Sequence, residues 1–169
     1  KGGVGTASFR MGDVTVGALA VANPLGSVVM PGTRTFWGWW LEQAGELGHQ
    51  TPPDAPPASL DHAFPWETRA GANTTLAVVA TDADLPREDC LRVAIMAQDG
   101  LARAIRPAHA PLDGDVVFAL STGRVAPGER LSDVSRIGML AADCTARAIM
   151  RGVYEAEGAG GVAGYREGG

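Results

Sequence analysis

The sequence predicts an α/β protein built around one core. Residues 74–81, TTLAVVAT, form a strongly apolar run that is typical of a strand buried on both faces. Amphipathic helical patterns follow at residues 86–101 and from residue 132 onward. The 169 residues are enough to bury roughly two-thirds of the surface of the unfolded chain. We therefore start from one compact core in which strands and helices alternate after residue 74.

Composition excludes several classes of protein. Apolar residues make up 46% of the chain and charged residues 20%, which fits neither a disordered nor a fibrous protein. No apolar run approaches the ~20 residues that a membrane span needs. The net charge is −5 and the 14 Lys and Arg residues are scattered, so we expect neither a nucleic-acid partner nor a membrane partner.

The first part of the chain reads as β structure. Residues 13–30, DVTVGALAVANPLGSVVM, contain two β-rich stretches around the turn-forming segment 23–26, which predicts a hairpin. The next segment carries Trp37, Trp39 and Trp40 and is too short to assign to strand or helix. Core packing is favoured for these rings, with a pocket wall or an interface as the alternative.

A Pro-rich segment separates this part from the rest. Residues 45–72 have no periodicity, and they include Pro52, Pro53, Pro56, Pro57 and Pro65. We expect a surface linker, and a linker of this length inside one domain tends to be functional or mobile. His49 and His62 lie within it, where they could not easily act as rigid ligands.

The helix predicted after the strand at 74–81 begins near Pro86. Glu88 and Asp89 fall in its first turn, where negative charge suits the helix dipole. Its apolar face comprises Cys90, Val93, Ala94, Ala97 and Leu101. Gly100 weakens the end of this helix.

A second pair of elements follows. Residues 116–120, VVFAL, predict another buried strand, and Ser132 is predicted as the N-cap of the last helix. The apolar face of that helix comprises Val134, Ile137, Ala141, Cys144 and Ala148. The predicted order is thus two strands, a linker, and then strand, helix, strand, helix.

The two cysteines do not predict a disulfide framework or a zinc site. Cys90 and Cys144 have neither the number nor the spacing that such sites require. We expect buried free thiols, which suit a reducing cytoplasm.

The opening KGGVGTAS does not predict a nucleotide loop. Lys1 precedes the glycines instead of following them, the third glycine of a dinucleotide fingerprint is missing, and the segment leads into strand-like sequence. No cofactor is therefore expected from this motif.

A small polar cluster lies in RPAHAPLDGDVVFAL. His109, Asp113 and Asp115 could form a metal or acid–base site, although one well-placed histidine is weak support for a metal. A turn at 113–115 before the strand explains these residues equally well, so the residues alone leave the choice open.

The junction between the linker and the strand at 74–81 offers a different chemistry. A cut before Thr74 would place a hydroxyl and a new α-amino group on one residue, which is a nucleophile with its own base. The reference pKa of such an amine is ~7.7–8, so a useful fraction is neutral near pH 7. A threonine at the start of a strand is also ordinary, and the residue types do not decide between these readings.

Four successive motifs resemble the DmpA family. They are KGGVGTAS, VTVGALAVAN, NTTLAVVATDA and AQDGLARAIRPAHAPLDGDVVFALSTG, in this order over most of the chain. This family comprises self-processing aminopeptidases and amidases, among them L-aminopeptidase/D-esterases, β-peptidyl aminopeptidases and a pantetheine hydrolase. The resemblance covers the C-terminal half of the family precursor, so we expect Lys1 to be an internal residue and the N-terminal half of the same precursor to be a partner.

The resemblance implies cleavage between Asn73 and Thr74. Residues 1–73, including the linker 45–72, would then end one chain, and residues 74–169 would begin a second chain with the nucleophile. By the same resemblance Asn23 donates its side-chain amide to the oxyanion. The Gly-rich segment 1–8 is expected to let the walls of the active site approach each other.

Asp113 and Asp115 fall where better-known family members have Ser-Gly-Glu. The resemblance implies that Asp115 orients the terminal amine and that Asp113 is a weaker partner. The exchange is a departure from the family pattern, because a carboxylate in place of the serine only accepts hydrogen bonds and the shorter acid reaches less far.

The implied fold is a four-layer α/β/β/α sandwich resembling the N-terminal-nucleophile hydrolases, with residues 1–169 part of a single domain. Family members tend to assemble as oligomers of α/β heterodimers. The implied activity is metal-free and cofactor-free release of N-terminal residues from short peptides or small amides. Hydrolysis of pantetheine-type amides and a processed but non-catalytic homologue are the alternatives.

Overall fold

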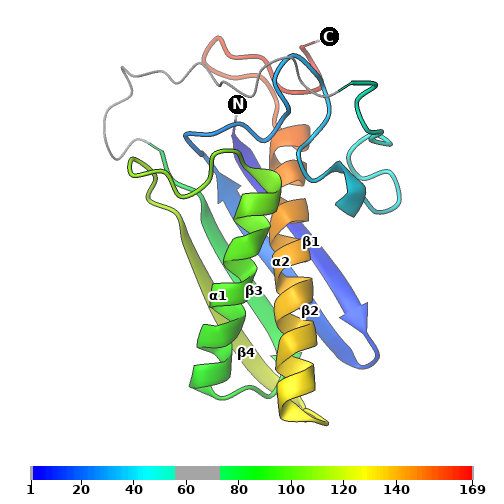
Figure 1. Ribbon diagram of the computed structural model, residues 1–169, viewed down its shortest axis with the longest axis vertical. Helices are drawn as coiled ribbons and strands as arrows, with labels where there is room; N and C mark the ends of the chain where they lie inside the picture. Colours follow the sequence, from blue (N-terminus) through cyan, green and yellow to red (C-terminus); the bar gives the residue numbers. More distant parts are fainter. Residues whose placement is uncertain (1, 56–72, 169) are drawn as a thin grey trace.

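The computed structural model describes residues 2–55 and 73–168. Its elements are β1 (Gly3–Met11), β2 (Val14–Ala22), the short 3₁₀ helix η1 (Trp39–Leu41), β3 (Leu76–Ala83), α1 (Arg87–Ala104), β4 (Val116–Val125) and α2 (Arg130–Glu155). The predicted order strand, helix, strand, helix after the linker is confirmed, whereas of the two strands before it only β2 lies at the residues predicted (Figure 1).

The four strands form one mixed sheet in the order β1-β2-β3-β4. The pairs β1–β2 and β2–β3 are antiparallel, and β3–β4 is parallel. A parallel pair needs a crossover connection, which α1 supplies.

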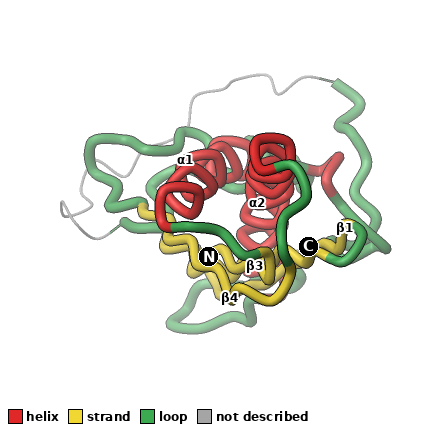
Figure 2. Tube along the Cα trace, turned by 90° about the horizontal axis from the view of Figure 1, so that it is seen from below, coloured by secondary structure: helices red, strands yellow, loops and turns green. Residues whose placement is uncertain are grey.

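Both long helices cover the same face of the sheet, so the described residues form one helix layer and one sheet layer (Figure 2). The core lies between them. The predicted apolar face of α2 is confirmed, because all five of its residues are buried. Gly100 has a different role from the weakening expected of it, since a Cβ there would lie 2.3 Å from the carbonyl oxygen of Ala142 and the glycine lets α1 and α2 touch.

The opposite side of the sheet carries exposed apolar side chains, and we call it the open face. Its residues are Val4, Leu19, Val21, Leu76, Val78, Phe118 and Leu120. They line up across the strands, with Leu19 opposite Val78 and Val78 opposite Phe118. The predictions that residues 74–81 are buried on both faces and that residues 116–120 form another buried strand are therefore wrong for the described chain, because its helices cover only one face.

The hairpin predicted around residues 23–26 is also wrong. The partner of β2 is the preceding strand β1, and the two-residue connection is formed by Gly12, with φ of 60°, and Asp13. After Ala22 the chain leaves the sheet, and Ser27 makes only an isolated bridge with Arg106.

The start of α2 also differs from the prediction. Glu129, rather than Ser132, is the N-cap, and its carboxylate accepts the N–H groups of Leu131 and Ser132 at 3.3 and 2.8 Å. A longer side chain one turn earlier thus satisfies the free donors of the helix terminus.

The predicted linker 45–72 is only partly described. Residues 45–55 contain no helix or strand, yet Leu47 is fully buried, so this part is not simply a surface linker. The Glu42 carboxylate organises it by accepting the N–H groups of Leu47, His49 and Gln50. Residues 56–72, including His62, lie outside the described residues.

The tryptophans and the thiols are placed as follows. Trp39 begins η1 and Trp40 is 56% exposed, while Phe36 is the aromatic residue buried in the core. Cys90 and Cys144 are free, as predicted, although only Cys144 is fully buried. Burial raises the pKa of the Cys144 thiol to about 11.

In the described parts of the chain, neither helix is long and apolar enough to cross a membrane.

The Gly-rich start of the chain does provide a close approach, but its neighbour is α2. A Cβ on Gly5 would lie 2.2 Å from the carbonyl oxygen of Ala148 and 2.4 Å from the nitrogen of Gly152. Backbone atoms of this kind cannot move aside as a flexible side chain can. Strand β1 and helix α2 therefore fit together only because Gly5 lacks a side chain.

This contact gives a test of the packing. Gly5→Ala in the full-length protein should lower the free energy of unfolding by about 1–3 kcal/mol, because the methyl group overpacks the interface with α2. Gly17→Ala is the matched control in the neighbouring strand, since its Cβ would meet nothing closer than 3.7 Å. Urea denaturation measures both, and equal losses for the two variants would contradict the close-contact explanation.

Candidate active site

The predicted site residues converge at one end of the sheet, where β2 finishes and β3 and β4 begin (Figure 1). Asn23 directly follows β2, Thr74 precedes β3, and Asp113 and Asp115 precede β4. Strands that are neighbours in a sheet bring these ends together, although the residues are up to 92 positions apart in the chain.

Backbone hydrogen bonds hold the Asn73–Thr74 peptide on both sides. The N–H of Thr74 donates to the carbonyl oxygen of Asn23 at 2.8 Å, and the N–H of Gly114 donates to the carbonyl oxygen of Asn73 at 3.0 Å. Asn73 also forms an isolated parallel bridge with Asp113. The peptide therefore extends the pairing of β3 toward the N-terminus, ahead of its first residue. It is fixed between the end of β2 and the loop before β4.

The Thr74 hydroxyl lies against this same peptide. Its Oγ1 donates to the carbonyl oxygen of Asn73 at 2.6 Å. A Cβ on Gly114 would lie 2.6 Å from that Oγ1, so only a glycine leaves room for the hydroxyl here. The carbonyl oxygen of Asn73 thus accepts two hydrogen bonds, one from a potential nucleophile and one from a backbone donor.

The Asp113 carboxylate connects two loops. Its Oδ1 accepts the N–H of Leu25 at 2.9 Å, and its Oδ2 accepts the N–H of Ala110 at 3.1 Å. It therefore holds the segment that follows Asn23 against the loop before β4. The observed turn lies earlier than the one predicted at 113–115, since the N–H of Asp113 donates to the carbonyl oxygen of Ala110 at 2.8 Å and closes a turn over residues 110–113.

The Asp115 carboxylate is almost completely buried, with 2% of its side chain exposed. Oδ1 accepts the N–H of Thr75 at 2.9 Å, and Oδ2 lies 3.2 Å from both the backbone nitrogen and the Nδ1 of His109. Within the described residues of the uncut chain, neither carboxylate accepts a hydrogen bond from Thr74; the donors are the N–H groups of Leu25, Ala110, Thr75 and His109.

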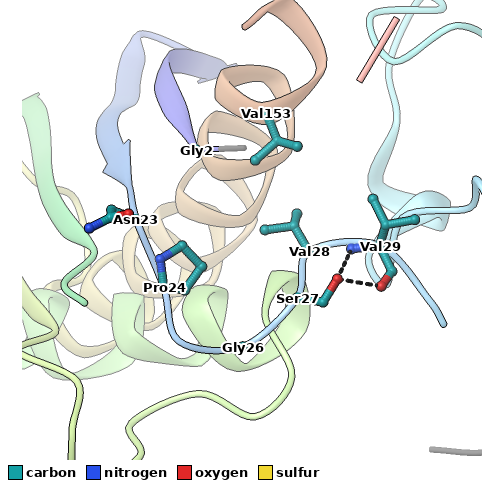
Figure 3. Close-up of a pocket in the computed structure, with 8 residues that line it drawn as sticks. All are labelled: Gly2, Asn23, Pro24, Gly26, Ser27, Val28, Val29 and Val153. Atoms are coloured by element: carbon teal, nitrogen blue, oxygen red, sulfur yellow. Dashed lines mark hydrogen bonds between the residues drawn. The ribbon is translucent and has the colours of Figure 1, made fainter. Parts of the chain in front are cut away.

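Asn23 is exposed, and its backbone carbonyl holds Thr74. A cavity of about 330 Å³ lies beside it and is also lined by Pro24, Val28 and Val153. Figure 3 shows the valine side chains extending into the space between the loop after β2 and the end of α2, with the Asn23 amide directed away from them.

Sequence reasoning missed three features of this site. Gly114 was interpreted only as part of a turn, and His109 only as a member of a metal or acid–base site. Thr75 was considered as an alternative to Thr74 for the nucleophile, but not as a partner of Asp115. Thr75 is fully buried, and its Oγ1 has no hydrogen-bond partner among the described residues. Among the described residues, no three His, Cys, Asp or Glu side chains gather as a potential metal site.

Comparisons with known proteins identify the family of this chain. Residues 1–167 match the model of Peptidase family S58. An uncharacterized aminopeptidase of Mycobacterium tuberculosis is 45% identical over 185 residues, which cover 99% of this chain and 52% of that protein. A 6-aminohexanoate-oligomer endohydrolase of Paenarthrobacter ureafaciens is 31% identical over 127 residues, covering 73% of this chain and 34% of that protein.

Solved structures show the same fold. A Burkholderia beta-aminopeptidase superposes with a TM-score of 0.59 at 24% identity, covering 97% of this chain and 45% of that one. The L-aminopeptidase D-Ala-esterase/amidase of Ochrobactrum anthropi, described as a variant of the Ntn hydrolase fold, has a TM-score of 0.55 at 25% identity, with coverages of 93% and 41%.

The chain spans about half the length of the curated relatives that it matches over nearly all of its own residues. The match to the family model extends over almost the whole chain, and the sheet and helices described above are shared with the aminopeptidases of known structure. The chain belongs to Peptidase family S58.

Proposed function

We propose that this protein cuts its own chain between Asn73 and Thr74 and then uses Thr74 as the nucleophile of an amide hydrolase. The observation that carries the proposal is the Thr74 Oγ1, which lies 2.6 Å from the carbonyl oxygen of the bond to be cut. Membership of a peptidase family supports hydrolysis as the type of reaction.

Self-cleavage would begin with attack of the Thr74 hydroxyl oxygen on the carbonyl carbon of Asn73. Negative charge then develops on the carbonyl oxygen, where the Gly114 N–H at 3.0 Å can stabilise it. The Thr74 nitrogen leaves as an amine while it faces the carbonyl oxygen of Asn23. The resulting ester joins the Asn73 acyl group to the Thr74 oxygen. Water hydrolyses it, which releases the Asn73 carboxyl group and regenerates the Thr74 hydroxyl beside the α-amino group that the shift has already freed.

In substrate turnover the new α-amino group acts as the base. It removes the proton of the Thr74 hydroxyl directly or through a water, as its pKa near neutrality allows. The side-chain amide of Asn23 donates to the oxyanion of the substrate, and one such donor contributes ~3–4 kcal/mol to transition-state stabilisation. No metal or cofactor takes part in these steps.

Asp113 and Asp115 support this arrangement by bonding the backbone next to the reacting groups. Asp115 bonds the N–H of Thr75, next to the nucleophile, and Asp113 bonds the N–H of Leu25, two residues after Asn23. Each carboxylate thus holds the backbone beside one reacting group. Asp115 is also the residue that we expect to orient the new amine once the chain is cut.

We propose that a second sheet, supplied by the N-terminal half of the same precursor, covers the open face. Such a partner would bury the apolar rows that include Leu19, Val78 and Phe118 and would complete a four-layer sandwich. Assembly of these α/β heterodimers into oligomers is part of the same proposal. The free thiols of Cys90 and Cys144 favour the cytoplasm as the location.

The substrates we propose are short peptides or small amides that lose an N-terminal residue. Pantetheine-type amides are the first alternative, and a protein that processes itself without turnover is the second. The similarity to 6-aminohexanoate-oligomer endohydrolases adds oligomers of ω-amino acids to the compounds worth testing.

Replacing each of the two adjacent threonines identifies the nucleophile. Thr74→Ala should leave the chain uncut and inactive, because the attacking oxygen is gone. Thr75→Val is the matched control: it removes a buried hydroxyl that has no hydrogen-bond partner while keeping the shape of the side chain. Denaturing mass spectrometry should find only the Thr75 variant cleaved, and the reverse pattern would move the nucleophile by one residue.

A methyl group on Gly114 should interfere with cleavage and leave folding intact. Gly114→Ala puts a Cβ 2.6 Å from the Thr74 Oγ1, which has to move aside. Because displacement of a reacting group by about 1 Å can slow a reaction about 100-fold, we expect self-cleavage to be slower by about that factor. Gly128→Ala is the control, because its Cβ would meet only Asp133 at 3.5 Å. Gel densitometry measures the rate of cleavage. If both variants are cleaved at the wild-type rate, the role of Gly114 is refuted.

A substrate panel separates the proposed activities. The cleaved protein should hydrolyse amino-acid p-nitroanilides faster than pantetheinyl amides or 6-aminohexanoate oligomers, as measured by kcat/KM. Faster hydrolysis of either of the other substrates would reassign the activity to that class. A cleaved protein with no turnover of any amide would support the non-catalytic alternative.

A further inference from the structure

His109 makes contacts that self-cleavage and turnover, as described above, do not use. Its Nδ1 and its backbone nitrogen both lie 3.2 Å from Oδ2 of Asp115, whose other oxygen accepts the N–H of Thr75 at 2.9 Å. A continuous path of polar contacts thus runs from His109 through Asp115 to the residue beside the nucleophile.

We propose that His109 is a positioning residue for Thr74, acting through Asp115. The inference rests on the proposed function, because the positioned group is the nucleophile of that reaction. His109 touches neither the hydroxyl nor the peptide to be cut, so its effect has to pass through the carboxylate.

The burial of Asp115 explains why a positioning residue is needed. Its side chain is 2% exposed, and a buried carboxylate requires hydrogen-bond donors to replace the water that it has lost. Two N–H groups, those of Thr75 and His109, donate to it in the described structure, and the ring Nδ1 of His109 lies 3.2 Å from its Oδ2. Loss of the ring would leave Oδ2 with the backbone N–H of His109 alone, and the carboxylate would be held less firmly beside Thr75.

The backbone of His109 is adapted to this contact. Its φ is 55°, in the left-handed region that few residues other than glycine adopt and in which asparagine and histidine are enriched. In this conformation the backbone N–H and the ring reach the same carboxylate oxygen.

Three variants of His109 in the full-length protein separate the side chain from the backbone. His109→Ala removes the ring and should slow self-cleavage and reduce kcat by about tenfold or more, with KM unchanged within about twofold. His109→Gly removes the ring but adopts a positive φ freely, and it should be as slow as the alanine variant. His109→Asn keeps a side-chain N–H donor and tolerates the left-handed conformation, so it should recover most of the rate.

A double-mutant cycle tests whether the effect passes through Asp115. In the background of Asp115→Asn, the further change His109→Ala should alter the cleavage rate by less than about twofold, because the coupled partner is already changed. If His109 only stabilised the fold, all of its variants would have a lower thermal stability. The change His109→Ala would then slow cleavage in the Asp115→Asn background as much as it does in the wild-type protein.

The outcomes distinguish this inference from the function on which it rests. If the wild-type protein stays uncut and inactive, the proposed function fails and the role of His109 fails with it. If the wild-type protein cuts itself while His109→Ala does so at the same rate, only the role of His109 is refuted. Recovery by glycine but not by asparagine would also refute it, because the backbone conformation alone would then matter.

Discussion

The hydrogen bonds on either side of the Asn73–Thr74 peptide are the constraint on which the rest of the site depends. The carbonyl oxygen of Asn23 holds the nitrogen of this peptide, and the N–H of Gly114 holds its oxygen. An extended segment clamped between two neighbours cannot rotate freely, so the Thr74 hydroxyl stays beside one carbonyl group. Positioning of this kind supplies a large part of the rate of an intramolecular reaction.

That constraint needs a rigid support, which the contact between sheet and helices provides. Gly5 and Gly152 bring β1 and α2 to backbone distance. The almost fully buried Arg147 extends this contact by pairing with Glu46 and by donating to the carbonyl oxygen of Ser8 at 3.1 Å. Helix α2 therefore contacts both the edge strand β1 and the loop that follows η1. It also carries Val153, which lines the cavity beside Asn23.

Much of the site was predictable because it depends on residue types with a distinct chemistry. Thr74, Asn23, Asp113 and Asp115 were selected by motif, and the order of strands and helices followed from periodicity; the fold then brings the ends of β2, β3 and β4 together. Their catalytic roles stay predictions. The proposed partners of the site carry weaker signals, because no periodicity of the sequence encodes the missing side chain at Gly114 or the contact of the His109 ring with Asp115.

The mistaken expectations have local physical causes. A hairpin was expected around residues 23–26 because proline and glycine suggest a turn, but Gly12 and Asp13 form a tighter one and β2 pairs with the strand before it. Ser132 has the usual chemistry of an N-cap, yet Glu129 reaches the same donors from one turn earlier. Apolar runs such as 74–81 cannot show which of their two faces the described helices cover.

Trapping the ester intermediate tests the central claim most directly. The full-length protein, freshly refolded in neutral hydroxylamine, is predicted to yield a chain that ends in an Asn73 hydroxamate and a second chain that begins with a free Thr74 amine, both identified by denaturing mass spectrometry. Hydroxylamine reacts with an ester far faster than with an amide, so this product reports the acyl shift to the Thr74 oxygen. An intact chain, or cleavage at another bond, would contradict the account.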